Sequence, residues 1–389
     1  MNDHPFDALS EASLRRRQSA KWTLFGADIL PAWVAEMDFP LAEPIRRVLC
    51  QAIDDADAGY ASSAGLGEVF AVWARERWGW SVAPGHVHLV ADVVTGIAEI
   101  LRVATLPGDG VLIEPPVYPA FAATIETIGR RVVSAPLSRT DLGWASDLNA
   151  IEDSYKSGAR VHVLCSPQNP TGLVYPRETL EAIADLAEKH RVLVLADEIH
   201  APLTLPGATH VPFPVVSDAA RRRSIVLTSA SKTWNIAGLK AAVMVASDET
   251  GDPHGPSAVL AKLPPETPYH AGHFGVIASK AAFLEGQAWL AQATAILDRN
   301  RSLLGALLKS ELPAIGYLPP QASYLAWLDC RGLRLGVDPC QVFLTRGKVA
   351  LSSGPTFGAE GEGFVRLNMG TSRGMLEEVV SRMRKALAP

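Results

Sequence analysis

Residues 159–198, ARVHVLCSPQNPTGLVYPRETLEAIADLAEKHRVLVLADE, contain two apolar runs separated by an amphipathic stretch. The runs at 159–167 and 191–198 are rich in valine and leucine, which favours buried strands. Between them, residues 177–190 place apolar side chains every three or four positions, which is the period of an α-helix. A strand, a helix and a second strand in this order are typical of a parallel sheet covered by helices on both faces, so this stretch predicts an α/β fold.

The same alternation continues on both sides of this unit. Further strands are predicted at 87–92, 110–116, 131–137, 224–231 and 241–247, with helices at 96–105 and 118–129. A largely parallel sheet of this kind binds its ligands at the carboxyl ends of its strands. Polar residues that directly follow a strand are therefore the first candidates for a functional site.

The last hundred residues have a different pattern and indicate a second domain. A chain of 389 residues is long for a single core. A long amphipathic pattern from about Lys280 to Leu312 is followed by short strand-like runs, which predicts a smaller α+β domain. We expect residues 1–48 to form an N-terminal segment that completes this small domain, residues 49–284 to form the large domain, and residues 285–389 to form the small domain.

Composition limits the class of partner. The chain is 48% hydrophobic and 20% charged, with a net charge of -5. These values are ordinary for a folded soluble protein and give no electrostatic reason to expect nucleic acid or an anionic membrane as partner, so a small-molecule substrate fits better. The four cysteines lack metal or disulfide spacing, and no apolar run has the length of a signal peptide core or a membrane span. We expect reduced cysteines, no metal and a cytoplasmic protein.

Several strand ends carry residues that could bind a ligand. Val94 and Thr95 open a predicted helix, whose free backbone N–H groups could hold a phosphate. Tyr118 follows the next strand and could cover a planar ring, although a core tyrosine is an equally good interpretation. The turn SPQNPTG, residues 166–172, offers the amide of Asn169, although a simple tight turn is the alternative.

Two further strand ends carry charged residues. Asp197 ends an apolar strand, and a buried carboxylate needs a cation or a hydrogen-bond donor. Lys232 lies in TSASKTWNIAGLK, residues 228–240, directly after the hydroxyl-bearing residues Ser229 and Ser231; a single lysine in such a place is usually solvated. An aromatic ring, an amide, a buried carboxylate, phosphate donors and an amine are together what pyridoxal phosphate requires, and their order along the chain is the specific part.

At these motifs the sequence resembles the fold-type I family of pyridoxal phosphate enzymes, the aspartate aminotransferase superfamily, over nearly the whole chain. It looks most like the branch of cystathionine β-lyases, or cysteine-S-conjugate β-lyases. The motifs that carry the resemblance are WVAEMDFP (33–40), DVVTGIAEIL (92–101), PVYPAF (116–121), CSPQNPTG (165–172), DEIHAPL (197–203), SASKTWNIAGLK (229–240), SYLAWLD (323–329) and FVRLN (364–368). The resemblance implies a mostly parallel seven-stranded sheet between helices, a smaller α+β domain, bound pyridoxal 5'-phosphate and a homodimer with shared active sites.

The resemblance also implies roles for single residues. Lys232 would form the Schiff base with the cofactor, Asp197 would pair with the pyridine nitrogen, and Asn169 would bond the phenolic oxygen of the ring. Tyr118 would stack on the ring. Arg366 would clamp the substrate α-carboxylate, a bidentate task that suits the planar guanidinium group.

The phosphate site implied by the resemblance draws on residues from two subunits. Ser229, with Ser231 and the backbone near Val94 and Thr95, would hold the phosphate. Tyr60 would reach the phosphate and the substrate from the neighbouring subunit.

The sequence departs from the family at two positions. His200 stands where aminotransferases commonly place a tyrosine against the ring oxygen, so we expect that contact to be absent or different. Lys240 stands where many relatives have a phosphate-binding arginine; it keeps the charge but not the forked geometry, which leaves its contact with the phosphate open. His270 and His273 lie where related chains pass near the partner's active site, and contact with substrate is a further possibility.

The reaction implied by this branch is a carbon–sulfur elimination. Cystathionine or another S-substituted L-cysteine would yield a thiol, pyruvate and ammonia, with Lys232 as general base and Asp197 keeping the ring nitrogen protonated. The motifs themselves do not separate elimination from transamination, so an aminotransferase is the alternative. A regulatory or binding role without turnover is a third interpretation, but the combination of Lys232, Asp197 and Arg366 argues against it.

Overall fold

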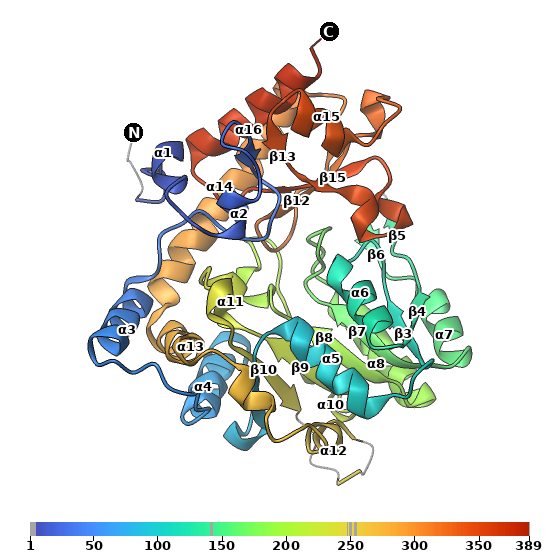
Figure 1. The fold of residues 1–389 in the computed structure, drawn as a ribbon. Helices are drawn as coiled ribbons and strands as arrows, with labels where there is room; N and C mark the ends of the chain where they lie inside the picture. Colours follow the sequence, from blue (N-terminus) through green and yellow to red (C-terminus); the bar gives the residue numbers. More distant parts are fainter. Residues whose placement is uncertain (1–4, 141–142, 247, 249–250, 253–254, 389) are drawn as a thin grey trace.

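A seven-stranded sheet forms the centre of the computed structural model, which describes residues 5–140, 143–246, 248, 251–252 and 255–388 (Figure 1). Neighbouring strands run parallel to each other, except that β10 is antiparallel to both of its neighbours, β2 and β9. Each of the seven predicted strand ranges contains one of these strands, so the mostly parallel sheet is confirmed. In spatial order the strands are β2 (Val87–Val90), β10 (Ala242–Ala246), β9 (Ser224–Thr228), β8 (Leu193–Asp197), β7 (Ala159–Cys165), β3 (Gly110–Ile113) and β4 (Arg131–Ser134).

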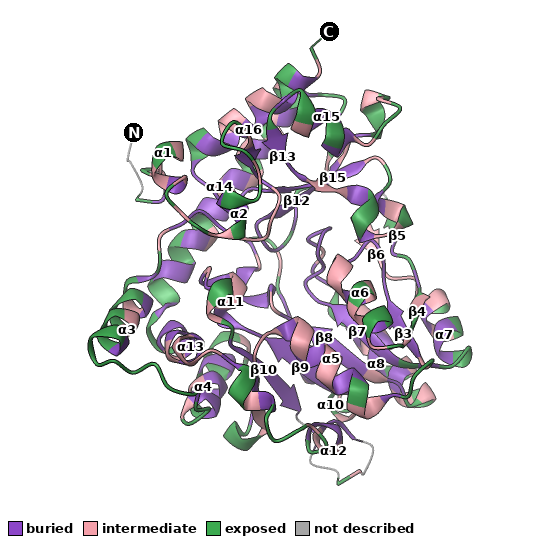
Figure 2. Ribbon diagram, in the orientation of Figure 1, coloured by how far each residue is buried: buried purple, intermediate pink, exposed green. Residues whose placement is uncertain are grey.

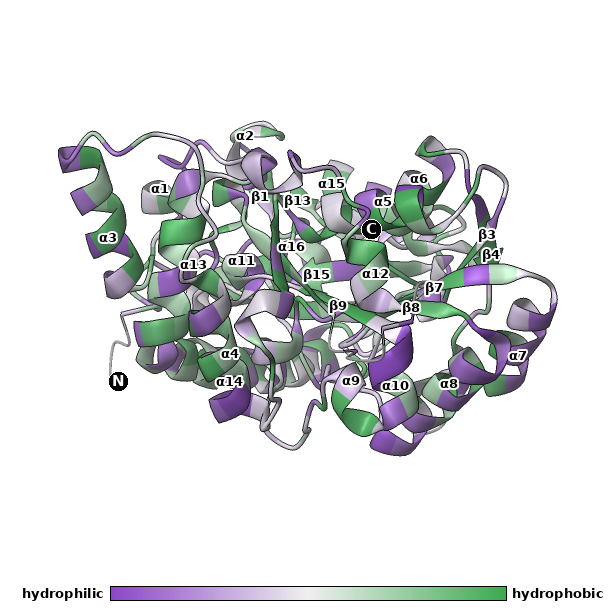
Figure 3. Ribbon diagram, turned by 90° about the horizontal axis from the view of Figure 1, so that it is seen from below, coloured by the Kyte–Doolittle hydropathy of each residue, from purple (hydrophilic) through white to green (hydrophobic). Residues whose placement is uncertain are grey.

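Both faces of this sheet are buried, because apolar side chains alternate between two cores. In β8, Val194 and Ala196 belong to one hydrophobic core and Leu195 to the other, as expected for a strand whose successive side chains point to opposite faces. Figure 2 shows the inner strands of the sheet almost entirely buried, whereas the edge strand β4 contains no buried residue. In Figure 3 hydrophobic colour runs along β8 and β9. The core that contains Leu195 also contains residues of α5 (Val93–Ala104), α6 (Pro119–Thr127) and α12 (Pro256–Leu260), and the other core contains residues of α4 (Leu66–Trp78), α7 (Leu148–Lys156), α8 (Arg177–His190), α9 (Phe213–Val216) and α10 (Asp218–Arg223).

A second, antiparallel sheet lies in the upper part of Figure 1 beside both chain termini. Its order is β11 (Gly316–Tyr317), β12 (Leu325–Asp329), β15 (Phe364–Asn368) and β14 (Ser352–Ser353). The N-terminal strand β1 (Leu30–Pro31) pairs in parallel with β13 (Val349–Ala350), so the N-terminal segment does contact the C-terminal region. The expected domain limit between residues 48 and 49 falls inside α3 (Glu43–Asp54); both domain limits stay predictions.

The other helices and one further hairpin lie before, between and after the strands of the two sheets. They are α1 (Glu11–Leu14), α2 (Ala20–Thr23), the hairpin of β5 (Ser138–Thr140) and β6 (Gly143–Ala145), α11 (Ala230–Thr233), α13 (His273–Glu285), α14 (Gln287–Glu311), α15 (Pro339–Thr345) and α16 (Arg373–Ala386). Within the described residues, none of the helices combines the length and the apolar character that crossing a membrane would need.

The single long helix expected near residue 285 is divided at Gly286 into α13 and α14. The backbone oxygen of Gly286 accepts a hydrogen bond of 3.0 Å from Nε1 of Trp234. A Cβ atom at position 286 would collide with that same Nε1 and with the carbonyl oxygen of Ala282. Glycine is therefore required where Trp234, two positions after Lys232, packs against the start of α14.

Replacement of Gly286 by alanine should lower the free energy of unfolding by about 1–3 kcal/mol, because the added methyl group must displace Trp234. Urea denaturation followed by tryptophan fluorescence measures the change. Gly374→Ala in the first turn of α16 is the matched control, since a Cβ there meets no atom within 4 Å; it should leave stability unchanged or raise it by up to about 1 kcal/mol. Equal effects of the two substitutions would contradict the explanation given for the break in the helix.

Candidate active site

Three of the predicted site residues meet at the carboxyl ends of neighbouring parallel strands. Asp197, the last residue of β8, pairs in register with Cys165 at the end of β7 and with Leu227 near the end of β9. Asn169 follows four positions after Cys165, and Lys232 follows five positions after Leu227. Because the three strands run in the same direction, their following loops lie at one edge of the sheet.

Asp197 is buried without a cationic hydrogen-bond partner. It is 5% exposed, and within the described part of the chain the only hydrogen bond to its side chain comes from the backbone N–H of Ile199, 3.1 Å from Oδ1. Burial raises the pKa of Asp197 from 3.8 to about 7, while the Ile199 bond and the charge of Lys232 act in the opposite direction. The site therefore holds an acid group suited to a protonated nitrogen of a ligand.

Lys232 lies on the short helix α11, which follows β9 directly. Its Nζ donates to the carbonyl oxygen of Ala35 at 2.9 Å. Burial and the charge of Arg366 lower the pKa of Lys232 from 10.5 to about 8, against the opposing effect of Asp197. At this pKa about a tenth of the amine is neutral at pH 7, far more than for an ordinary lysine. The side chain can therefore act as a nucleophile or as a base.

Arg366 reaches the same place from β15 in the second sheet. Its Nη1 donates to Oδ1 of Asn169 at 2.9 Å and its Nη2 to the carbonyl oxygen of Trp33 at 3.0 Å, while the guanidinium carbon lies 4.9 Å from the centre of the Phe357 ring. Its Nε is buried and has no acceptor among the described residues. Buried donors normally have a partner, so this nitrogen is available to an anionic ligand.

Tyr118 lies at the start of α6, where the chain leaves β3. Its ring packs edge-to-face on Phe121, with 5.7 Å between the ring centres. Burial raises the pKa of the Tyr118 phenol, and the charges of Arg366 and Asp197 also act on it. The structure therefore brings Tyr118 to the same site, with its hydroxyl group protonated at neutral pH.

Asp92 is a site residue that the sequence analysis did not identify. It precedes α5, accepts a hydrogen bond of 2.8 Å from the backbone N–H of Thr95, and forms an ion pair of 2.9 Å with Nζ of Lys240. Lys240 thus lies beside Val94 and Thr95, as the predicted phosphate site requires, but in this structure Asp92 shares both the Thr95 amide and the lysine. An aspartate directly before a helix is the N-cap signal that could have identified it.

The two predicted serines precede Lys232 at the beginning of α11, with Ser229 as the N-cap of the helix and Ser231 inside it. The Ser229 hydroxyl accepts a hydrogen bond of 3.0 Å from the backbone N–H of Ser231 and donates one of 2.6 Å to the carbonyl oxygen of Ala241. The second bond joins Ser229 to the residue that follows Lys240. Ser229, Lys240 and the N-terminus of α5 therefore form one side of the site.

His200 is buried at the site in a neutral state. Its Nδ1 is hydrogen-bonded to the Ser323 hydroxyl at 3.0 Å, and its ring centre lies 6.0 Å from that of Tyr324. Burial, with the charges of Lys232 and Arg366, lowers the pKa of His200 to about 3. Nδ1 of the side chain is thus bonded to a protein partner, and its contact with a ring oxygen stays a prediction.

Tyr60 lies apart from the other predicted site residues of the same chain. It is 87% exposed, and its ring packs edge-to-face on Tyr269 with 6.4 Å between the ring centres. His273 in the same region forms an ion pair of 3.0 Å with Asp57, and His270 ends the short turn that contains Tyr269.

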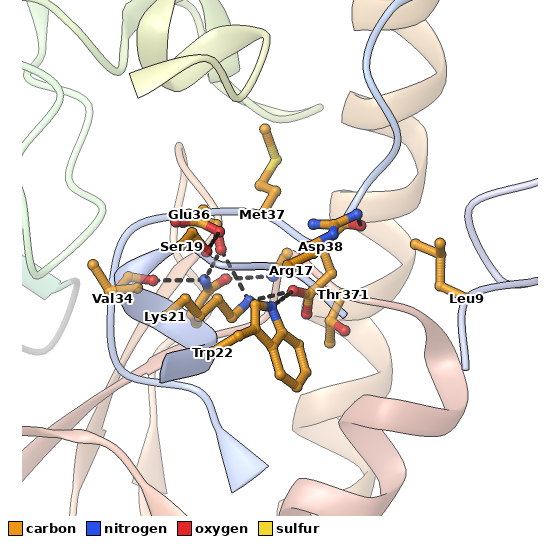
Figure 4. Close-up of polar contacts among 12 residues, drawn as sticks. Leu9, Arg17, Ser19, Lys21, Trp22, Val34, Glu36, Met37, Asp38 and Thr371 are labelled. Atoms are coloured by element: carbon orange, nitrogen blue, oxygen red, sulfur yellow. Dashed lines mark hydrogen bonds and ion pairs between the residues drawn. The ribbon is translucent and has the colours of Figure 1, made fainter. Parts of the chain in front are cut away.

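Residues 33–38 form a part of the site that was not predicted from the sequence, although they lie in the motif WVAEMDFP. The carbonyl oxygen of Trp33 accepts from Arg366, and that of Ala35 accepts from Lys232 and, at 3.0 Å, from the hydroxyl group of Tyr324. Figure 4 shows the contacts of this segment with helix α2 and its N-cap, where Glu36 and Asp38 contact Ser19, Lys21 and Trp22. Backbone carbonyl groups carry no residue-specific signal, which explains why the sequence did not reveal these contacts.

Comparison with known proteins gives consistent relatives. Residues 81–383 match the family described as aminotransferase class I and II. A protein of Mycobacterium tuberculosis, provisionally named as a cystathionine beta-lyase, is 41% identical over 100% of this chain and 99% of its own. Cystathionine beta-lyase PatB of Bacillus subtilis is 35% identical over 95% of this chain and 97% of its own. The crystal structure of cystalysin from Treponema denticola, which contains pyridoxal 5'-phosphate, superimposes with a TM-score of 0.88 at 26% identity and covers 96% of either chain.

The raised pKa of Asp197 predicts a stability that falls with pH in the ligand-free protein. Between about pH 4 and pH 7 the unfolded chain loses the Asp197 proton while the folded chain keeps it, so folding becomes less favourable as the pH rises. Asp197→Asn removes this effect. In urea denaturation the stability of the variant relative to the wild type should increase as the pH rises through this range, and the gain should level off at about 4 kcal/mol above pH 7.

Asp329→Asn is the matched control with the opposite sign. Hydrogen bonds from Arg331 and Arg139 outweigh the effect of burial and lower the pKa of Asp329 to about 2. Its ionised form therefore stabilises the fold above pH 4, and Asp329→Asn should lose stability at pH 8. A comparable loss in Asp197→Asn would show that Asp197 already has a cationic partner in the ligand-free protein.

Proposed function

Because the chain belongs to the class I and II aminotransferase family, we propose that it is a pyridoxal phosphate-dependent carbon–sulfur β-lyase. The observation that carries the proposal is a buried carboxylate, Asp197, which has no cationic hydrogen-bond partner among the described residues and interacts electrostatically with Lys232, whose own pKa is lowered to about 8. The 35% identity over nearly the full length to a cystathionine beta-lyase selects the elimination reaction within the family.

The donor and acceptor groups of the site fit this cofactor. Asp197 offers a buried acid to a protonated ring nitrogen, and Lys232 offers a partly neutral amine to an aldehyde. Asn169 would bond the ring oxygen and Tyr118 would cover the ring. A phosphate would bind on the side of the site formed by Ser229, Ser231, Lys240 and the backbone at Val94 and Thr95. There it would compete with Asp92 for the Thr95 amide and the Lys240 amine.

When bound, the cofactor supplies an electron sink for the electrons that remain on Cα of the substrate after its proton leaves. The residues of this chain do the rest. The Lys232 amine would take the proton from Cα, which its lowered pKa allows near neutral pH. Asp197 would hold the proton at the ring nitrogen. The carbonyl oxygen of Ala35, which accepts a hydrogen bond from Lys232, would orient that amine.

The substrate that we propose is an S-substituted L-cysteine. Arg366, whose buried Nε has no acceptor in the described part of the chain, would bind the α-carboxylate in a site that Asn169 helps to align. The Cβ–S bond breaks, the sulfur leaves with a proton as a thiol, and one water molecule is consumed as the remaining three-carbon unit becomes pyruvate and ammonia. Cystathionine, which would release homocysteine, is the member of this class that the named relatives favour.

A homodimer with shared active sites is part of the proposal. It is supported by Tyr60 and Tyr269, two aromatic side chains that are 87% and 61% exposed and pack against each other on the surface. In a dimer, Tyr60 would reach the phosphate and substrate side of the partner's site, and His270 and His273 would lie near that interface.

We also propose that the enzyme acts in the cytoplasm. Its four cysteines are all free, with Cys50 exposed and the other three buried. Free cysteines are typical of a reducing compartment.

Release of a thiol from an S-substituted L-cysteine, without any keto acid present, tests the proposed reaction directly. We expect equimolar thiol and pyruvate from the purified protein supplied with pyridoxal phosphate, and a loss of at least about a thousandfold in kcat for Lys232→Ala. Lys262→Ala, at an exposed lysine of the same chain, is the matched control and should keep full activity. Negligible thiol release together with keto-acid-dependent turnover would favour the aminotransferase alternative.

Arg366→Lys separates charge from geometry in carboxylate binding. Lysine keeps the positive charge but not the fork that meets Asn169, Trp33 and a carboxylate at once. We expect kcat/KM to fall by about ten- to a hundredfold, mainly through KM. Steady-state kinetics with the L-amino acid and with its amide, which lacks the carboxylate, checks the assignment. An equal loss for both compounds would contradict a role in carboxylate binding.

A further inference from the structure

Residues 32–38 are held by an unusual series of backbone contacts. Each of the seven consecutive carbonyl oxygens accepts a hydrogen bond of 2.7–3.0 Å from a residue at least 15 positions away in the chain. In order from Ala32 to Asp38, the donors are the residues Asn368, Arg366, Asn368, Lys232, Lys21, Asn235 and Arg17. We call residues 33–38 the strap.

A buried ion pair holds the strap on the side that faces away from Lys232. Nζ of Lys21 lies 2.8 Å from Oδ1 of Asp38, and the two side chains are 1% and 2% exposed. The same Nζ donates to the carbonyl oxygen of Glu36 at 3.0 Å, and Nε1 of Trp22 donates to Oδ1 of Asp38 at 3.2 Å. Figure 4 shows these groups converging from helix α2 onto the strap.

This ion pair is not explained by stability alone. Removing two charges from water costs several kcal/mol for each ion, and well-packed apolar residues in their place are often as stable or more stable. A buried pair does define one geometry, because any displacement leaves a charge unsatisfied. Lys21 and Asp38 take no part in the chemistry proposed above, so their effect must pass through the segment that they hold.

The opposite side of the strap contacts the catalytic groups. The carbonyl oxygen of Ala35 accepts from Nζ of Lys232 and that of Trp33 from Arg366. Asn235, three positions after Lys232, accepts from the backbone N–H of Met37 and donates to its carbonyl oxygen, both at 2.7 Å. The strap is therefore bonded to α2 on one side and to the lysine segment on the other.

We propose that Lys21 is a positioning residue: its ion pair with Asp38 sets the strap so that the Ala35 carbonyl meets the free amine of Lys232 and the Trp33 carbonyl meets Arg366. The catalytic consequence rests on the proposed function, whereas the effect on the Lys232 amine does not. Without the ion pair the strap loosens, water reaches Lys232, and the amine loses the acceptor that orients it.

The reactivity of Lys232 in the cofactor-free protein tests this directly. Competitive labelling of amines with acetic anhydride at a series of pH values, followed by mass spectrometry of the peptide that contains Lys232, gives the midpoint of its titration. The wild-type midpoint should lie at about 8. Burial is the largest cause of the lowered pKa of Lys232, so loosening the strap should raise the midpoint, by about one pH unit.

Three variants separate positioning from folding. Lys21→Met with Asp38→Leu replaces the pair by apolar side chains of similar volume and should keep the fold. Lys21→Arg keeps the charge and should stay near the wild-type midpoint. Arg382→Met is the matched control: it removes an ion pair with Glu378 and bonds to the carbonyl oxygens of Asp28 and Lys348, but no contact of the strap.

The proposal predicts a raised Lys232 midpoint in the apolar double variant alone, together with a fall in kcat/KM for thiol release of about ten- to a hundredfold. A folded double variant with the wild-type midpoint overturns the proposal, whatever its activity, because the pair would then be only structural. If the double variant has a raised midpoint but the wild-type protein releases no thiol, the positioning role is supported and the proposed reaction is refuted. Failure of the positioning proposal can therefore be distinguished from failure of the proposed function.

Discussion

The buried carboxylate of Asp197 is the group on which the rest of the site depends. It ends a strand that is apolar on both faces, and within the described residues its side chain is bonded only to a backbone N–H. Such a group is unfavourable in its ionised form, which is why burial raises its pKa to about 7. A ligand with a protonated ring nitrogen would stabilise the ionised form of Asp197. Binding of such a ligand would therefore offset the free energy that burial of the acid costs.

The remaining groups come from three distant parts of the chain. The strands of the large sheet and the segments that follow them supply Asp197, Lys232 and Tyr118. The second sheet supplies Arg366, and the N-terminal segment supplies the carbonyl oxygens of Trp33 and Ala35. The site is complete only when all three parts are in place. We therefore expect the proposed chemistry to depend on all three parts of the chain, and the Lys21–Asp38 ion pair to influence the Lys232 amine through the strap.

Much of this arrangement could be predicted from the sequence, because strands with two buried faces leave continuous apolar runs and their ends locate Asp197 and Lys232. Other features have no local signal. The break at Gly286 depends on Trp234, which is 52 positions away, and the contacts of Ala35 use only backbone atoms. The N-cap of Asp92 was visible in DVVT but was not used. The position of Tyr60 in a partner's site stays a prediction, since it concerns a second subunit.

One measurement tests the central claim most directly: incubation of the protein with pyridoxal 5'-phosphate, reduction with borohydride, and mapping of the modified peptide by mass spectrometry. The account predicts one reduced adduct per chain, on Lys232, and weaker retention of the cofactor in Asp197→Asn, which cannot hold the ring nitrogen's proton. An adduct confined to other lysines, or retention that is unaffected by the change at Asp197, would contradict it.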